Sequence, residues 1–164
     1  MIDTAIFREA MSRLGAAVNL ITTDGVAGRH GMTASAVCSV TDSPPTILVC
    51  VNRASVANEK FRANGVLCLN VLAGRHQALP GHFSDKGLSI EARFGAGDDW
   101  TRLVTGSPVL RDASVALDCR IADISEVGTH NVFFCQVEDA AFHRDKSALV
   151  YFDRAYHALT GTAD

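Results

Sequence analysis

The stretch GMTASAVCSVT, residues 31–41, decides the fold of this chain. If it forms a β-strand, successive side chains point to opposite faces of the sheet. One face then carries small or apolar side chains, and the other carries a row of hydroxyls that only Val37 interrupts. A half-buried strand more often turns charged side chains to the solvent. The uncharged, hydrogen-bonding row predicts instead that a polar, phosphorylated ligand lies along this strand.

The segments on either side of this stretch predict a mostly β architecture. Residues 44–52 (PPTILVCVN) turn the chain into a strand that is apolar on both faces, which is typical of a buried central strand. Residues 55–64 predict a helix with Ser55 as its N-cap and with Val56 and Phe61 on its inner side. Residues 3–14 predict an amphipathic helix. Further strands are expected over residues 16–23, 66–72, 114–127, 131–142 and 148–152.

About six or seven strands joined mostly by tight turns, with one or two helices, predict an antiparallel β-barrel with helical decoration. A doubly wound parallel sheet would need a helix between most pairs of strands, and the sequence lacks them. Residues 73–106 carry weaker signals, which suit short helices and polar loops. No repeat, linker or low-complexity segment divides the chain, so we expect a single domain over residues 1–164.

The composition restricts the classes of function. Hydrophobic residues make up 48% of the 164 residues and charged residues 20%, as in an ordinary soluble domain. A formal net charge of −3 without a basic cluster argues against a nucleic-acid or membrane-surface partner. No apolar run suffices for a membrane span and the N-terminus lacks a signal-peptide pattern, so we expect a cytoplasmic protein. The five cysteines form no C-x-x-C pair and are expected to be structural free thiols.

A candidate anion site follows the predicted strand 44–52. There Asn52-Arg53-Ala54-Ser55 leaves the strand and begins a helix, whose first N–H groups and dipole favour an anion. Ser35 belongs to the preceding strand, which should pair with strand 44–52 across the turn at Pro44. Hydroxyls and helix N–H groups could therefore converge on one phosphate. The alternative is that Ser55 only caps its helix and Asn52 only ends a strand, and the residues do not decide between the two.

Familiar catalytic and metal-binding motifs are missing. The glycines at 25, 28 and 31 precede a strand rather than a helix, so they do not form a Rossmann fingerprint. The six histidines show no metal-ligand spacing, and we expect no metal site. No Gly-x-Ser-x-Gly sequence exposes a nucleophile. His130 alone stands out, because it follows Gly128-Thr129 at a strand junction where a turn could project its imidazole into the mouth of a barrel. The alternative is that it merely fills the turn.

Several separated segments resemble the short-chain flavin reductases that serve two-component flavin monooxygenases. They match the family in order and spacing, and they are residues 31–41, 44–52, 68–72 (CLNVL), 128–130 (GTH) and 149–159 (LVYFDRAYHAL). The likeness covers nearly the whole chain. Within the family it is greatest to the flavin reductases of pyrimidine utilisation, through residues 7–11 (FREAM), residues 15–19 (GAAVN) and the C-terminal segment.

The resemblance implies an FMN-binding split β-barrel, antiparallel and Greek-key-like, with a few short helices. It implies a homodimer with two flavin sites near the subunit interface. It also implies that NADH, or NADPH, binds over the flavin, FMN or FAD, without a Rossmann domain. Position by position, it assigns the flavin's polar tail and ring edge to Thr33, Ala34 and Ser35. The ribityl–phosphate end is assigned to Asn52 and Ser55.

The remaining positions that the resemblance assigns lie in the second half of the chain. Phe83 belongs to a loop that borders the flavin, and Arg154 and Tyr156 lie where the terminal segment approaches it. His130 matches the histidine on the nicotinamide side of the pocket and is the candidate catalytic residue. Many relatives carry Gly-Asp-His where this chain has Gly128-Thr129-His130, so the local carboxylate is absent here.

The function implied by the resemblance is hydride transfer from NAD(P)H to flavin, with the chemistry supplied by the cofactors. Reduced flavin would then diffuse to a flavin-dependent monooxygenase. The alternative is a flavin-binding split barrel without turnover, acting as a carrier or sensor. A pyridoxamine-phosphate-type oxidase would need a cationic pocket for the substrate phosphate, and the sequence offers few clustered basic residues.

Overall fold

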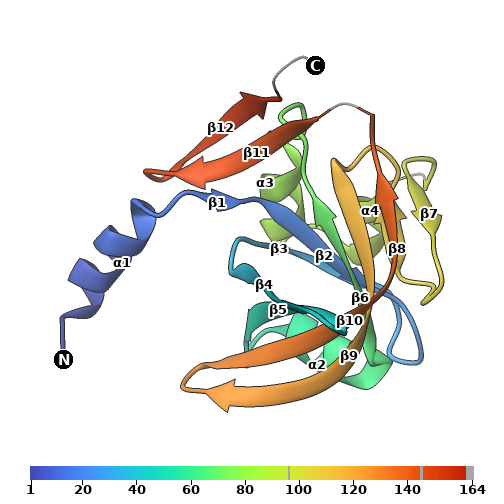
Figure 1. Ribbon diagram of the computed structural model, residues 1–164, viewed down its shortest axis with the longest axis horizontal. Coiled ribbons are helices and arrows are strands. Elements are labelled where there is room, and N and C mark those ends of the chain that lie inside the picture. The colour runs from blue at the N-terminus through green and yellow to red at the C-terminus, as the bar shows by residue number, and fades with distance from the viewer. Residues whose placement is uncertain (96, 145, 162–164) are drawn as a thin grey trace.

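The computed structural model describes residues 1–95, 97–144 and 146–161. Its main element is a curled seven-stranded sheet (Figure 1). In order across the sheet, its strands are β3 (His30–Ala34), β2 (Asn19–Thr23), β6 (Val66–Val71), β9 (Val115–Val127), β10 (His130–Phe142), β5 (Pro45–Asn52) and β4 (Val37–Asp42). Every pairing between neighbours is antiparallel. Within the described residues the edge strands β3 and β4 do not pair with each other, so the sheet is a split barrel rather than a closed one. The predicted antiparallel β architecture is confirmed.

The deciding stretch is two strands, not the one strand that was predicted. β3 pairs with β2, so that Ala34 lies opposite Asn19, whereas β4 pairs with β5, so that Val37 lies opposite Val49. Between them the Val37 amide donates a hydrogen bond to the Ser35 carbonyl (2.9 Å), which turns the chain tightly. The turn also reverses the alternation of faces, because Val37 packs against the core like Ala34. Alternation along a sequence cannot reveal such a break, so the predicted row of hydroxyls is split between two edges of the sheet.

The core lies against the inner face of this sheet and is covered at one end by α2 (Val56–Asn64). Phe61 of α2 is fully buried and meets Phe133 of β10 edge to face, with the ring centroids 6.2 Å apart. Val56 was expected beside Phe61, but it is 59% exposed, because it begins the helix on the solvent side. Strand β5 is also less central than predicted. It lies next to the edge strand, and Leu48 and Cys50 on its outer face are half-buried.

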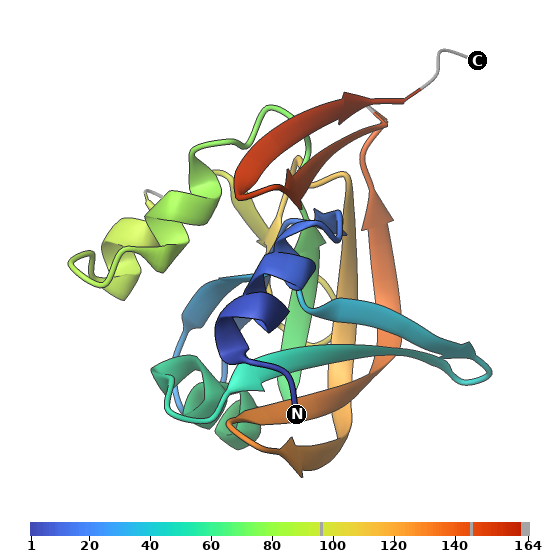
Figure 2. The same ribbon diagram turned by 90° about the vertical axis from the view of Figure 1, so that its left-hand side faces the viewer.

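A second group of elements covers the opposite end of the sheet. It consists of α3 (Leu79–Ser84), α4 (Ile90–Phe94) and the ribbon of β7 (Trp100–Arg102) and β8 (Pro108–Leu110). Phe83, Phe94 and Trp100 form an aromatic cluster with ring centroids 4.7–5.8 Å apart. Figure 2 shows α3 and α4 extending from one side of the sheet.

The N-terminal and C-terminal segments form a third unit, a sheet in the order β1 (Ala16–Ala17), β11 (Ser147–Phe152) and β12 (Ala155–Thr160). The predicted strand 16–23 is therefore divided between two sheets, and β12 was not predicted. The predicted N-terminal helix is confirmed as α1 (Thr4–Ser12). Its apolar side chains do not pack on the core: Ile6 is 61% and Phe7 51% exposed. Figures 1 and 2 show α1 projecting from the body of the chain.

The cysteines are all free thiols, as expected. Cys68, Cys119 and Cys135 are buried, and burial raises the pKa of the Cys135 thiol to about 12, which makes it inert. Cys38 on the edge strand β4 is exposed. None of the helices over the described ranges is long and apolar enough to cross a membrane. In the same ranges no three His, Cys, Asp or Glu side chains group in a way that could hold a metal ion.

Candidate functional site

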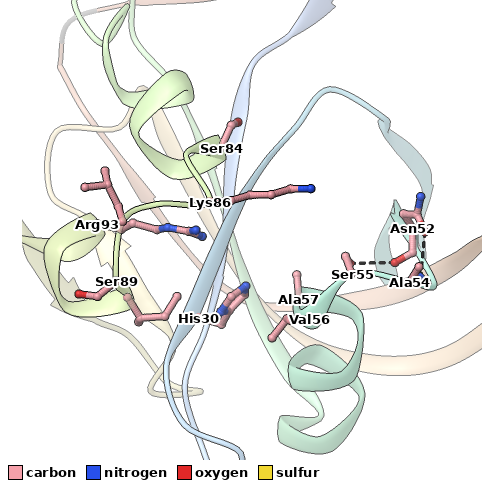
Figure 3. Close-up of a pocket in the computed structure, with 12 residues that line it drawn as sticks. His30, Asn52, Ala54, Ser55, Val56, Ala57, Ser84, Lys86, Ser89 and Arg93 are labelled. Carbon is pink, nitrogen blue, oxygen red and sulfur yellow. Dashed lines mark hydrogen bonds between the residues drawn. The ribbon is translucent and has the colours of Figure 1, made fainter.

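The larger of two neighbouring hollows lies between the start of β3, the turn from β5 into α2, and the segment that joins α3 to α4 (Figure 3). Its volume is about 770 Å³. We call it the larger hollow, and it is lined by His30, Asn52, Ala54, Ser55, Val56, Ala57, Ser84, Lys86, Leu88, Ser89, Ile90 and Arg93. Of the predicted binding residues, the larger hollow brings together Asn52 and Ser55.

The turn from β5 into α2 is held by the side chains that were predicted to bind an anion. The Asn52 side-chain oxygen accepts a hydrogen bond from the Ala54 amide (2.9 Å). Ser55 Oγ donates to the Asn52 carbonyl (2.8 Å) and accepts from the Asn58 amide (3.3 Å). Ser55 is therefore the N-cap of α2, as predicted. The same bonds direct the N-terminal end of a nine-residue helix at the larger hollow, where its partial positive charge favours an anion.

The charged groups that line the larger hollow are all basic. Lys86 and Arg93 extend across it from the side opposite Ser55, and His30 lies between them and α2 (Figure 3). Among the residues that the structure describes, no carboxylate belongs to the lining. Arg93 is fixed, because its Nη2 donates to the Asp85 carbonyl (2.7 Å). Burial lowers the pKa of His30, and the nearby charges of Arg93 and Lys60 lower it further. The lining is thus short of negative charge and suits an anionic group.

The second hollow, of about 220 Å³, is lined by uncharged groups. We call it the smaller hollow, and its lining residues are Val18, Thr33, Ala34, Ser35, Ser84, Tyr151 and Tyr156. Ser84 lines both hollows, so the two lie next to each other. Thr33 Oγ1 and Ser84 Oγ both donate to the Pro80 carbonyl, at 2.9 and 2.8 Å, which ties β3 to α3. The rings of Tyr151 and Tyr156 are 5.6 Å apart. Hydroxyls beside aromatic rings suit a flat, uncharged ligand with polar edges.

Gly31 explains how α3 comes so close to β3. A Cβ at this position would lie 2.6 Å from Cε1 of Phe83 and 3.2 Å from Cζ of Phe94. Only glycine therefore lets the Phe83 ring pack on the strand. Because Ser84 follows Phe83 in α3, this contact sets Ser84 where the two hollows meet.

Three predicted residues lie outside both hollows. The Phe83 ring is buried in the aromatic cluster and lines neither of them. Arg154 lies in the β11–β12 turn and pairs with Glu9 of α1 (2.7 Å), and it lines neither hollow. His130 is exposed at the start of β10. The register places it directly opposite Asn52 of β5, and side chains directly opposite each other share one face of a sheet.

Sequence reasoning missed most of the lining of the larger hollow, including its polar residues His30, Ser84, Lys86, Ser89 and Arg93. His30 directly precedes the deciding stretch and is buried. Lys86 and Arg93 lie in the region of weak signals, and the fold brings these two basic residues together at the larger hollow. The sequence does contain one feature that could have indicated this part of the lining. It is the polar run from Ser84 to Ser89 between two short apolar segments, which is typical of a binding loop.

Comparisons with known proteins agree with this geometry. The sequence model of the family described as "Flavin reductase like domain" matches residues 11–160. The FMN reductase (NADH) RutF of Variovorax paradoxus is 54% identical over 159 residues, which are 97% of this chain and 87% of that protein.

Solved structures with this fold include the NADH:FAD oxidoreductase SgcE6 of Streptomyces globisporus, in complex with NAD and FAD fragments. Its TM-score is 0.88 at 26% identity, covering 99% of this chain and 96% of that one. BorF, the flavin reductase component of a bacterial two-component tryptophan halogenase, has a TM-score of 0.90 at 26% identity, covering 98% and 100%. The match over residues 11–160, the extent of the RutF identity and the split barrel lead to one conclusion: this chain belongs to the flavin reductase family.

Proposed function

We propose that this chain is an NADH-dependent FMN reductase that transfers a hydride from NADH to FMN and releases reduced flavin to a partner monooxygenase. The observation that carries the proposal is the meeting of the two hollows at Ser84. One is lined by cationic groups and a helix N-terminus, the other by hydroxyls and tyrosines. A ligand with a phosphate at one end and a flat polar ring at the other fits this pair. The RutF protein that is 54% identical to this chain is an NADH-dependent FMN reductase by name.

The residues present fit the flavin. Lys86, Arg93 and the first amides of α2 would hold the phosphate, and Asn52 and Ser55 would border the chain that leads from it. Thr33, Ala34, Ser35 and Tyr156 would contact the uncharged end. When bound, the flavin supplies the hydride-accepting chemistry, and the protein contributes binding and orientation.

His130 is proposed to position the nicotinamide. It starts β10 opposite Asn52, whose side chain lines the larger hollow, so it borders the proposed flavin site. No acid–base pair is required for hydride transfer, which agrees with the lack of a catalytic dyad in the sequence. Both hollows are open to solvent and hold few cations, so the flavin can leave after reduction.

The test is anaerobic turnover. Catalytic amounts of the protein are mixed with NADH and an excess of FMN, and the loss of the yellow absorbance of oxidised flavin is followed. We expect complete bleaching at a rate proportional to the protein concentration. Flavin that binds but stays oxidised would support the carrier or sensor alternative and overturn the proposal. Repeating the assay with NADPH, FAD and riboflavin measures the preference for each cofactor.

We also propose that the chain acts as a homodimer in the cytoplasm, where NADH is available, and that it serves a monooxygenase of pyrimidine degradation. The dimer is supported by the exposed apolar residues of α1 (Ile6, Phe7 and Met11) and by Leu14 just after it, because an apolar stripe of this kind is normally covered. Sedimentation of the wild type and of Phe7→Glu tests it. We expect a dimer that the substitution weakens, and a wild-type monomer would contradict it.

A further inference from the structure

Arg53 joins the end of β5 to the turn between β9 and β10. Its backbone amide donates to the Thr129 carbonyl (2.9 Å), and its Nη1 donates to the Gly128 carbonyl (3.3 Å). Its Nη2 pairs with Oε2 of Glu126 at 3.2 Å. One residue of the β5–α2 turn thus contacts both residues of the β9–β10 turn and Glu126 near the end of β9.

This turn carries His130 into place. Gly128 has a φ of +55°, the left-handed conformation that suits glycine, and Thr129 follows it. Thr129 Oγ1 lies 2.9 Å from Nδ1 of His130, within hydrogen-bond distance. The imidazole therefore takes its position from the turn, and the turn takes its position from Arg53.

A buried contact fixes the strand beyond His130 but not the turn itself. The Asn131 side chain donates to the side-chain oxygen of Asn58 in α2 (3.0 Å), and both residues are buried. The turn residues Gly128 and Thr129 are exposed, and among the described contacts only Arg53 anchors them besides the strand pairing, while Arg62 reaches Glu126 near the end of β9 (4.0 Å). Arg53 is thus the side chain that holds this end of the hairpin.

The guanidinium of Arg53 does not take part in the larger hollow. Asn52, Ala54 and Ser55 line it, whereas Arg53 lines a different hollow together with Arg62 and Asn131. A loss of flavin binding is therefore not expected from removing its side chain.

We propose that Arg53 is a positioning residue that acts through His130: it holds the β9–β10 turn so that the imidazole stays opposite Asn52 at the edge of the flavin site. The inference rests on the proposed reductase function. A displacement of about 1 Å in a positioning group can lower a rate by up to about a hundredfold. An exposed ion pair contributes little to stability, so the effect should fall on catalysis rather than on folding.

The experiment compares Arg53→Gln with Arg62→Gln. Arg62 is the matched control, because it reaches the same Glu126 (4.0 Å) from α2 but, over the described residues, forms no hydrogen bond or ion pair with residues 128–130. For Arg53→Gln we expect hydride transfer in anaerobic single turnover to fall about tenfold or the KM for NADH to rise about tenfold. The Kd for FMN should change less than about twofold and the Tm less than about 3 °C. Arg62→Gln should match the wild type, and Arg53→Lys should recover part of the loss, since lysine can pair with Glu126 but lacks the planar fork.

His130→Ala and the double variant decide whether Arg53 acts through the histidine. We expect the double variant to be no slower than His130→Ala alone, because groups that act as one unit are not additive. Additive losses, an unaffected His130→Ala beside a slow Arg53→Gln, or a wild-type rate for Arg53→Gln would each overturn the inference. A wild type that fails to reduce FMN would instead overturn the proposed function, so the two failures are distinguishable.

Discussion

The larger and the smaller hollow share Ser84 but differ in chemistry. The larger hollow is lined by Lys86, Arg93 and a buried histidine and receives the N-terminus of α2. The smaller hollow has no charged lining residue and is bordered by hydroxyls and two tyrosines. The difference supports the proposal that the larger hollow takes the phosphate of the flavin and the smaller one its ring. Substitutions in the two hollows should therefore separate ligands that carry a phosphate from those that do not.

The largest effect is expected from a substitution of Gly31, because its contact with the Phe83 ring sets the position of Ser84, which lines both hollows. Gly31→Ala places a Cβ 2.6 Å from the Phe83 ring, and overpacking of this kind costs about 2 kcal/mol of unfolding free energy. Since the ring must move, Ser84 moves with it and both FMN and riboflavin should bind more weakly. Chemical denaturation and flavin titration measure the two effects. Gly81→Ala in α3 is the control, because its Cβ would meet nothing within 4 Å, and equal destabilisation of both variants would contradict the prediction.

A charge removed from the larger hollow should affect only ligands with a phosphate. Lys86→Gln is expected to raise the Kd for FMN about tenfold, or ~1.4 kcal/mol, and to leave the Kd for riboflavin unchanged. Ser35→Ala in the smaller hollow is the counterpart. It should raise the Kd for FMN and the Kd for riboflavin by the same factor, which is smaller than the effect of Lys86→Gln on FMN. Fluorescence titration with the two flavins measures this. If Lys86→Gln weakened the binding of riboflavin as much as that of FMN, the assignment of the phosphate end would be wrong.

His30 should make the stability of the free protein sensitive to acid. Its pKa is lowered in the folded chain, so the unfolded chain takes up the proton first as the pH falls. The stability that this group contributes is present above its ordinary pKa of 6.5 and is lost as the pH falls below that value. Between about pH 7 and pH 5 the Tm of the wild type should therefore fall more than that of His30→Gln. Bound FMN should reduce the difference and riboflavin should not, and identical pH profiles for the two proteins would refute this.

The smallest effect is expected from Arg154, which lies outside both hollows. Its pKa is raised by the Glu9 carboxylate that it pairs with, but both side chains are about half exposed, so the pair contributes little to stability. Arg154→Gln should leave flavin affinity within about twofold of the wild type. Isothermal titration with FMN tests this. A large loss of affinity would show that Arg154 reaches a flavin site, which the partner subunit of a dimer could provide.

The elements of this fold were largely predictable, but the way they combine was not. Alternating residues marked the long strands β9 and β10, and Ser55 marked the start of α2, because both signals depend on neighbours in sequence. Strand β12 was missed because its side chains are exposed and carry no alternation of burial. Phe83 and Arg154 were assigned to the site from resemblance alone. Their neighbours in space, Gly31 and Glu9, lie far away in the sequence.

The sequence by itself determined an antiparallel β protein, the helix cap at Ser55, and a family resemblance carried by residues 31–41 and 128–130. Those features are local, since rows of hydroxyls along a strand, helix caps and turns depend on residues that are neighbours in the sequence. Only the tertiary structure decided that residues 31–41 break into two edge strands and that His30, Lys86 and Arg93 gather at one hollow. The physical reason is that the shape of a cavity and the charges that line it depend on which segments the sheet brings together. A small number of long-range contacts, such as the Phe83 ring on Gly31, determine which segments those are.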